Sequence, residues 1–211
     1  MDALSHILDK KIIAIVRGAE PSAVLQMAEA LCEGGIQLME ITLNSPQALA
    51  VIEKLAKTMG DKMLIGAGTV LTARDAEKAI ASGARFIISP IVDAATIELT
   101  RRHGVVSIPG AYTPTEIVHA YTSGGHIIKV FPASSNMNYI KEIRGPLPHI
   151  PLMPTGGINL DNIREFKDAG AVAFGIGTAL VNTKQSPTKL YMQQITKKAR
   201  AFVQAVSTVV C

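Results

Sequence analysis

One stretch decides the fold: residues 21–43, which read PSAVLQMAEALCEGGIQLMEITL. Its first part, residues 21–33, has the apolar spacing of an amphipathic helix, and Gly34-Gly35 predicts the end of that helix. Residues 38–43 then form a short run that is apolar at nearly every position rather than at alternate ones. Parallel strands that are covered on both faces have this composition. The stretch therefore predicts a helix that leads into a buried parallel strand.

The same unit recurs along the chain. Eight strand-like runs are expected, at residues 12–16, 38–43, 63–65, 86–88, 105–108, 127–131, 150–153 and 172–174. Helices are expected near residues 21–33, 46–58, 73–82, 94–102, 114–123, 137–143, 160–169 and 188–207. Ser45-Pro46 and Thr113-Pro114 predict helix starts with a hydroxyl cap. Eight βα units predict a (β/α)8 TIM barrel, one domain over residues 1–211, with a doubly wound open sheet as the alternative. Residues 2–10 predict an extra N-terminal helix across the bottom of the barrel.

The composition excludes several classes of protein. Apolar residues make up 48% of the chain and charged residues 18%, which excludes disorder. Aromatic residues make up only 4%, without Trp, so platforms for stacking bases are scarce and no nucleic-acid partner is expected. The longest stretch without Asp, Glu, Lys or Arg, residues 145–160, contains four prolines and is too short to span a membrane. With no signal-peptide pattern at the start, a soluble cytoplasmic protein is expected.

Two charged side chains interrupt the apolar strands. Lys129 lies within the run at residues 127–131, and Glu40 lies within the run at residues 38–43. A buried ammonium group must be paired or must lose its proton, and a neutral amine is the nucleophile that forms a Schiff base with a carbonyl compound. If both side chains point inward, Glu40 can act beside the lysine as a general acid and base. A buried Lys–Glu pair with a purely structural role is the alternative.

Other strands are followed by residues that can bind a ligand, at the end of the barrel where active sites lie. Arg17 follows the first strand and can hold a carboxylate, or it can face solvent at the rim. Gly66-Ala67-Gly68-Thr69 follows the third strand and either lets the backbone approach a ligand or forms a tight turn. Gly156-Gly157 and Gly177-Thr178 follow the last two strands, where barrels often bind phosphate. The histidines are dispersed, so no metal site is expected.

Six motifs, in order along the chain, resemble those of the KDPG/KHG aldolases. They are Met39-Glu40-Ile41-Thr42-Leu43, Ile65-Gly66-Ala67-Gly68-Thr69-Val70, Ile88-Ser89-Pro90, Ile108-Pro109-Gly110, Lys129-Val130-Phe131-Pro132 and Pro154-Thr155-Gly156-Gly157-Ile158. These class I aldolases act on 2-keto-3-deoxy-6-phosphogluconate and 4-hydroxy-2-oxoglutarate. The resemblance covers about the whole chain. It implies a (β/α)8 barrel, a homotrimer, and no cofactor or metal.

The resemblance also implies a role for each matching residue. Lys129 would form the Schiff base and Glu40 would be the general acid and base. The residues at the pyruvate end, which carries the carboxylate, would be Arg17, Thr69, Pro90 and Thr155. The residues at the phosphate would be Gly156, Gly157, Gly177 and Thr178. The expected reaction is retro-aldol cleavage of a 2-keto-3-deoxy-6-phospho sugar acid to pyruvate and an aldehyde such as glyceraldehyde 3-phosphate, with 4-hydroxy-2-oxoglutarate as a further substrate.

The sequence departs from the family shortly after Glu40. Many members carry there an arginine that contacts the keto-acid carboxylate, whereas this chain has Asn44-Ser45-Pro46, so Arg17 is the natural substitute. The runs at residues 44–47 and 131–135 look more like the 6-phosphogalactonate enzymes, and the run at residues 154–157 looks more like the phosphogluconate enzymes. The configuration of the substrate therefore stays open. So do two other functions: a phosphosugar epimerase or isomerase with Glu40 as its base, and a non-catalytic phosphosugar-binding protein.

Overall fold

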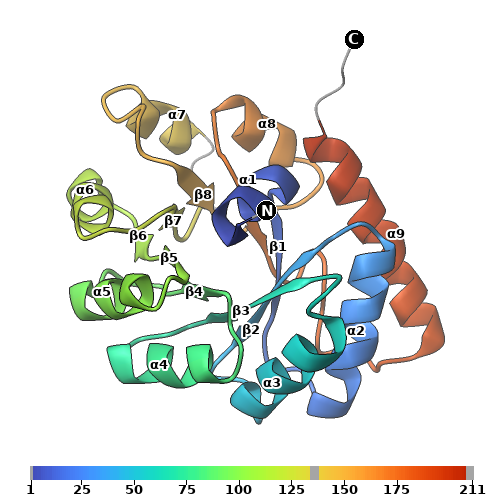
Figure 1. Cartoon of the computed structure of the whole chain (residues 1–211). Coiled ribbons are helices and arrows are strands. Elements are labelled where there is room, and N and C mark those ends of the chain that lie inside the picture. Colours follow the sequence, from blue (N-terminus) through green and yellow to red (C-terminus); the bar gives the residue numbers. More distant parts are fainter. Residues whose placement is uncertain (1, 134–137, 208–211) are drawn as a thin grey trace.

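The computed structural model describes residues 2–133 and 138–207, so Ser134 and Ser135 of the run at residues 131–135 lie outside it. Helices alternate with strands along this part of the chain (Figure 1). The strands are β1 (Ile12–Val16), β2 (Leu38–Thr42), β3 (Leu64–Gly68), β4 (Phe86–Ile88), β5 (Val106–Ile108), β6 (Gly110–Ala111), β7 (Ile128–Val130), β8 (Leu152–Pro154) and β9 (Phe174–Ile176). The helices are α1 (Ala3–Lys10), α2 (Pro21–Glu33), α3 (Ala48–Met59), α4 (Ala73–Ala81), α5 (Ala94–Arg102), α6 (Pro114–Thr122), α7 (Asn138–Arg144), α8 (Ile163–Asp168) and α9 (Lys189–Val206).

The strands form a closed parallel barrel. One sheet has the order β5-β4-β3-β2-β1-β9 and the other has the order β6-β7-β8. β5 and β6 are the two halves of one strand, interrupted at Pro109, which has no N–H to donate to a ladder. The remaining seam, between β8 and β9, is closed by a parallel bridge between Thr155 and Gly175. With β5 and β6 counted as one strand, the barrel has eight, and the predicted (β/α)8 fold is confirmed.

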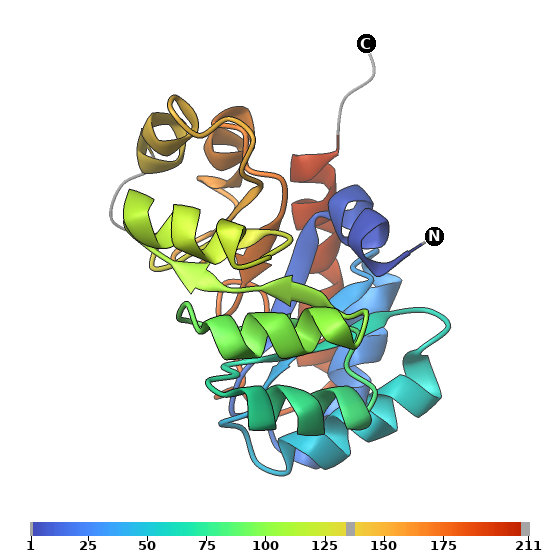
Figure 2. The same ribbon diagram turned by 60° about the vertical axis from the view of Figure 1, so that its left-hand side comes forward.

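Helices cover the outside of the barrel and also pack against one another. α2 and α9 lie side by side in both views (Figures 1 and 2), and the Thr196 hydroxyl on α9 donates a 3.0 Å hydrogen bond to the Ala30 carbonyl on α2. The larger of the two apolar cores lies between this helical layer and the outer face of the strands. That double covering explains why the strands are apolar on both faces.

A second apolar cluster fills the inside of the barrel. Its buried members are Ile7, Ile13, Leu38, Phe86, Ile88, Val106, Ile108, Ile127, Met153 and Ala173. Ile7 comes from α1, which lies across one end of the barrel (Figure 1), so the extra N-terminal helix is confirmed. Side chains alternate along a strand, so Glu40, two residues after Leu38, and Lys129, two residues after Ile127, also point inward. They lie nearer the carboxyl ends of the strands, above this apolar layer.

Two local predictions between residues 45 and 68 were wrong. The sequence predicts that the third strand ends at Ile65, but β3 continues to Gly68 and pairs with β2 along its whole length. The sequence also predicts a helix start at Ser45-Pro46, but α3 begins at Ala48 and no side chain caps it. The Thr113-Pro114 prediction is confirmed, since α6 begins at Pro114 and Thr113 caps it with a capping box.

Among the described residues, none of the helices is both long enough and apolar enough to cross a membrane.

Candidate active site

Lys129 lies in the middle of β7 with only 3% of its surface exposed. Burial lowers the pKa of its amine because the ammonium form loses its hydration; the nearby charge of Arg17 lowers this pKa further, and that of Glu40 raises it. The side-chain nitrogen lies 5.0 Å from the centre of the Phe131 ring. The fold therefore favours a neutral, nucleophilic amine at the carboxyl end of the barrel.

Glu40 lies on β2 and is completely buried. Neither of its carboxylate oxygens has a hydrogen-bond partner among the described residues. Burial raises the pKa of this carboxyl group, although the charges of Lys129 and Arg17 both lower it. Burial therefore extends the pH range over which Glu40 keeps its proton, and the protonated carboxyl group is the state that a general acid needs before it donates. Because Glu40 and Lys129 each respond to the charge of the other, the structure brings the two predicted residues together.

Glycines on the neighbouring strands make room for these polar side chains. A Cβ atom on Gly68 would lie 1.5 Å from Oε1 of Glu40, so the carboxyl group occupies the space that a side chain on β3 would fill. Gly175 on β9 has the same relation to Thr155, whose Oγ1 would lie 2.4 Å from the added Cβ. These glycines are strand residues, and their role is to leave space beside the site.

A cavity of about 420 Å³ lies at the ends of β1, β7, β8 and β9. The predicted site residues that line it are Arg17, Thr155, Gly156, Gly157, Gly177 and Thr178. Thr155 is buried, and its hydroxyl has no hydrogen-bond partner among the described residues. Two cations, Arg17 and Lys184, line the cavity, and its described lining includes no Asp or Glu. The cavity is therefore suited to an anionic ligand.

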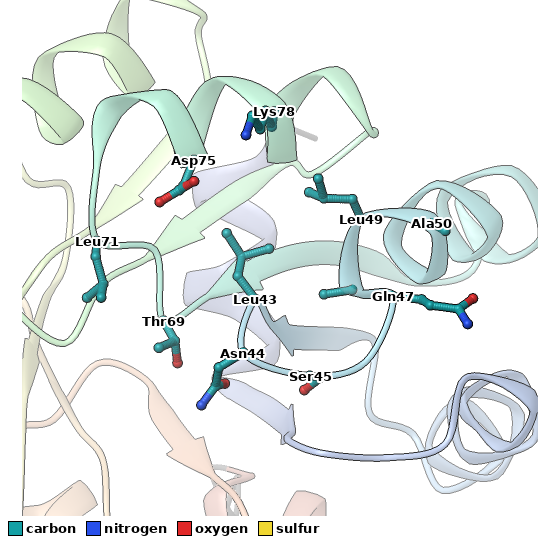
Figure 3. A pocket seen from close by; sticks show the side chains of 11 residues that line it. Leu43, Asn44, Ser45, Gln47, Leu49, Ala50, Thr69, Leu71, Asp75 and Lys78 are labelled. Carbon is teal, nitrogen blue, oxygen red and sulfur yellow. The ribbon is translucent and has the colours of Figure 1, made fainter.

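Four predicted residues are not among the lining of this cavity. Lys129 and Glu40 are buried inside the barrel, and the other two are Thr69 and Pro90. Thr69 has a left-handed backbone with a φ of 56° and lines a second cavity of about 640 Å³ beside Asn44 and Ser45 (Figure 3). The backbone of Pro90 packs against Gly110, the β6 residue in register with Lys129. The structure thus places both residues around the site but not with Arg17.

Four polar residues that line the 420 Å³ cavity were not predicted from the sequence: Asn159, Asn182, Thr183 and Lys184. Three of them belong to the segment between β9 and α9. The Asn182 N–H donates to the Tyr191 hydroxyl at 2.6 Å, and the Asn182 side-chain oxygen accepts from the Lys184 N–H at 3.1 Å. The available signal was the polar run at residues 182–188, between β9 and α9. Across the described residues, no group of three or more His, Cys, Asp or Glu could hold a metal ion.

Comparisons with known proteins agree with this geometry. The family model for KDPG and KHG aldolase matches residues 4–197. The chain is 34% identical over 196 residues to the 2-dehydro-3-deoxy-6-phosphogalactonate aldolase of Escherichia coli K12, with 92% of this chain and 93% of the relative covered. It is 34% identical over 158 residues to a 2-dehydro-3-deoxy-phosphogluconate aldolase of Treponema pallidum, with 74% of this chain and 75% of the relative covered.

Solved structures give the same result. A native KDPGal structure superposes with a TM-score of 0.86 at 33% identity and covers 92% of this chain and 93% of its own. The KDPG aldolase of Legionella pneumophila, with pyruvate captured as a covalent carbinolamine intermediate, superposes with a TM-score of 0.84 at 29% identity and covers 99% of both chains. These comparisons confirm the expected class I aldolase, a carbon–carbon lyase, and the chain belongs to the KDPG and KHG aldolase family.

Proposed function

We propose that Lys129 and Glu40 carry out the retro-aldol cleavage of a 2-keto-3-deoxy-6-phospho sugar acid in this chain. The observation that carries the assignment is the pair itself: a buried lysine with a lowered pKa and a buried glutamate with a raised pKa, each within reach of the other's charge. Two titratable groups whose pKa values are shifted by burial toward their neutral forms are a mark of acid–base catalysis.

The first half of the reaction forms the Schiff base. The neutral amine of Lys129 attacks the keto carbon, and a carbinolamine results. Glu40 donates its proton to the carbinolamine hydroxyl, which leaves as water, and the C=N⁺ bond forms. The carboxylate that remains is the base for the next step.

The second half breaks the carbon–carbon bond. Glu40 removes the proton of the hydroxyl on the fourth carbon, and the bond between the third and fourth carbons breaks. Its electron pair moves toward the iminium, which becomes an enamine, and the aldehyde leaves. The enamine then takes this proton from Glu40 on its terminal carbon. Water hydrolyses the resulting iminium to pyruvate, and the extra proton on Lys129 returns to the Glu40 carboxylate.

The 420 Å³ cavity is the proposed site of the phosphate group. After Gly177 the chain makes a helical turn, because the N–H groups of Leu180 and Val181 both donate to the Gly177 carbonyl at 2.9 Å. Turns of this kind after the last strand favour anions at their start. We assign the phosphate to Gly156, Gly157, Gly177 and Thr178, and Lys184 adds a positive charge to the same cavity.

Arg17 is the proposed partner of the substrate carboxylate. The carboxylate lies one bond from the carbon that Lys129 attacks, so its partner must lie near the reacting pair. The charge of Arg17 influences the pKa of both Lys129 and Glu40, which fits this requirement. We place Thr155, whose buried hydroxyl lines the same cavity, at this end of the substrate as well, with Thr69 and Pro90 around it.

The test is turnover by a Lys129→Met variant. Pyruvate release would be measured with 2-keto-3-deoxy-6-phosphogluconate, 2-keto-3-deoxy-6-phosphogalactonate and 4-hydroxy-2-oxoglutarate, with Lys57→Met as the matched control because Lys57 is exposed on α3. We expect the control to turn over at least one of these substrates and Lys129→Met to turn over none, with the fold intact. Unchanged pyruvate release by Lys129→Met would overturn the role of Lys129, and no pyruvate release by the unmodified protein would favour an epimerase or a silent binder.

The homotrimer and the cytoplasmic location are also part of the proposal. Three large apolar side chains are exposed in the segments that follow β3, β4 and β6: Leu71 (47%), Ile91 (46%) and Tyr112 (38%). Contact between copies of the chain at this end of the barrel would bury them. Light scattering at micromolar concentration is expected to give three chains, and a monomer would contradict the trimer. Cell fractionation tests the location.

A further inference from the structure

The corner of the chain that carries Arg17 is held from two sides by hydroxyl groups. The Thr183 hydroxyl, from the segment after β9, donates a 2.6 Å hydrogen bond to the Arg17 carbonyl. The N–H of Gly18, which follows Arg17 and has a left-handed φ of 68°, donates a 2.8 Å hydrogen bond to the Ser45 hydroxyl oxygen. The peptide group between Arg17 and Gly18 is thus held at both its carbonyl and its N–H by segments far away in the sequence.

Ser45 also connects this corner to the strand that carries Glu40. Its hydroxyl lies 2.9 Å from the hydroxyl of Thr42, which is completely buried at the end of β2. Thr42 lies two residues after Glu40, and so on the same face of that strand. A chain of hydroxyl groups therefore runs from β2 through Ser45 to the turn at Gly18. Ser45 does not cap α3, which begins at Ala48, so its hydroxyl is committed to this contact.

We propose that Ser45 and Thr183 are positioning residues for Arg17, which they aim at the substrate carboxylate. The inference rests on the role of Arg17 in the proposed function. Arg17 itself is exposed, and a long exposed side chain loses affinity for its partner when its backbone anchor moves. We call the hydrogen bonds of Thr183 and Ser45 to this corner the clamp. The clamp fixes the backbone of Arg17 at one position relative to Glu40.

The test uses pyruvate, which carries the carboxylate and the keto group but no phosphate. Borohydride traps the imine of pyruvate, and the pyruvate concentration that gives half-maximal trapping measures carboxylate affinity. The variants are Ser45→Ala, Thr183→Val and Arg17→Ala, each alone, and each hydroxyl variant combined with Arg17→Ala. Ser45→Thr and Thr183→Ser keep the hydroxyl and should rescue. Thr58→Val is the matched control, since that hydroxyl bonds the Lys54 carbonyl on an exposed helix face.

We expect Ser45→Ala and Thr183→Val each to raise the half-saturating pyruvate concentration about two- to tenfold, the effect of one hydrogen bond. At saturating pyruvate the trapping rate should stay within about twofold of the unmodified protein, because binding rather than chemistry is affected. In the Arg17→Ala background neither substitution should add anything. Competition by inorganic phosphate should not change in Ser45→Ala.

The outcomes separate two failures. If Arg17→Ala raises the half-saturating pyruvate concentration but the hydroxyl variants do not, the clamp is refuted while the role of Arg17 stands. Hydroxyl variants that act equally with and without Arg17 also refute the clamp, because their effect is then structural. If Arg17→Ala has no effect, the assignment of Arg17 in the proposed function is wrong, and the clamp fails with it.

Discussion

Gly68→Ala tests whether the position of Glu40 controls catalysis. The added Cβ would lie 1.5 Å from Oε1, 2.1 Å from Cδ and 2.5 Å from Cγ of Glu40. Ordinary van der Waals contact begins at 3.4 Å, so the carboxyl group must move by roughly 1.9 Å. A displacement of about 1 Å in a catalytic group can cost about 100-fold in rate. We therefore expect kcat to fall by at least ~100-fold, although no catalytic side chain has been removed.

The assay combines turnover with thermal and denaturant unfolding in a double-mutant cycle with Glu40→Ala. In the unmodified protein, overpacking should lower the free energy of unfolding by about 1–3 kcal/mol. In the Glu40→Ala background the clash is gone, and the alanine should instead stabilise by about 0.4–1 kcal/mol because it restricts the unfolded chain. The change of sign identifies Glu40 as the group that Gly68 accommodates.

Gly145→Ala is the matched control, because an added Cβ there would approach nothing closer than 3.3 Å, and Gly145 lies just after α7, outside the site. It should leave kcat unchanged. If Gly68→Ala keeps kcat within about threefold of the unmodified protein, the steric reasoning is wrong. An equal loss of stability with and without Glu40 would also refute it.

Three further predictions concern charge and burial. Glu40→Gln should lower the midpoint pH of pyruvate trapping on Lys129, because the charge of Glu40 raises the pKa of the lysine. An unchanged midpoint would show that the two groups are not coupled. Lys184→Ala should raise KM for the phosphorylated substrate about tenfold but leave the half-saturating pyruvate concentration unchanged. Steady-state kinetics and pyruvate trapping measure the two quantities, and a weaker binding of pyruvate would contradict the prediction. Thr155→Val removes a buried hydroxyl without a hydrogen-bond partner among the described residues. It should therefore raise the free energy of unfolding by about 1 kcal/mol while kcat falls. Calorimetry and turnover measure the two effects, and a rise or fall of stability and kcat together would argue against a substrate contact.

The alternation of strands and helices was predictable because it follows from local pattern. The apolar runs that predict Ile12–Val16 and Phe86–Ile88 match β1 and β4 residue for residue. The last two strands were predicted to end too early, by one residue for β8, which ends at Pro154, and by two for β9, which ends at Ile176. Proline and glycine are rare inside strands, so their presence masked the true ends.

The site was predictable where a charge interrupts an apolar strand. Lys129 and Glu40 stand out because burial of a charge is costly, and the structure brings them together as that argument requires. Residues whose role depends on distant partners gave no such signal. Gly68 is needed because of Glu40 on another strand, and Ser45 contacts Gly18 across 27 positions of sequence. Tertiary contacts of this kind cannot be read from local composition.

The most direct test of the account is reduction with borohydride in the presence of pyruvate, followed by intact and peptide mass spectrometry. The account predicts one reduced pyruvyl adduct per chain, located on Lys129, although that lysine is almost fully buried while many other lysines are exposed. An adduct that is absent from the folded protein, or that is spread over exposed lysines, would contradict a Schiff-base mechanism at this site.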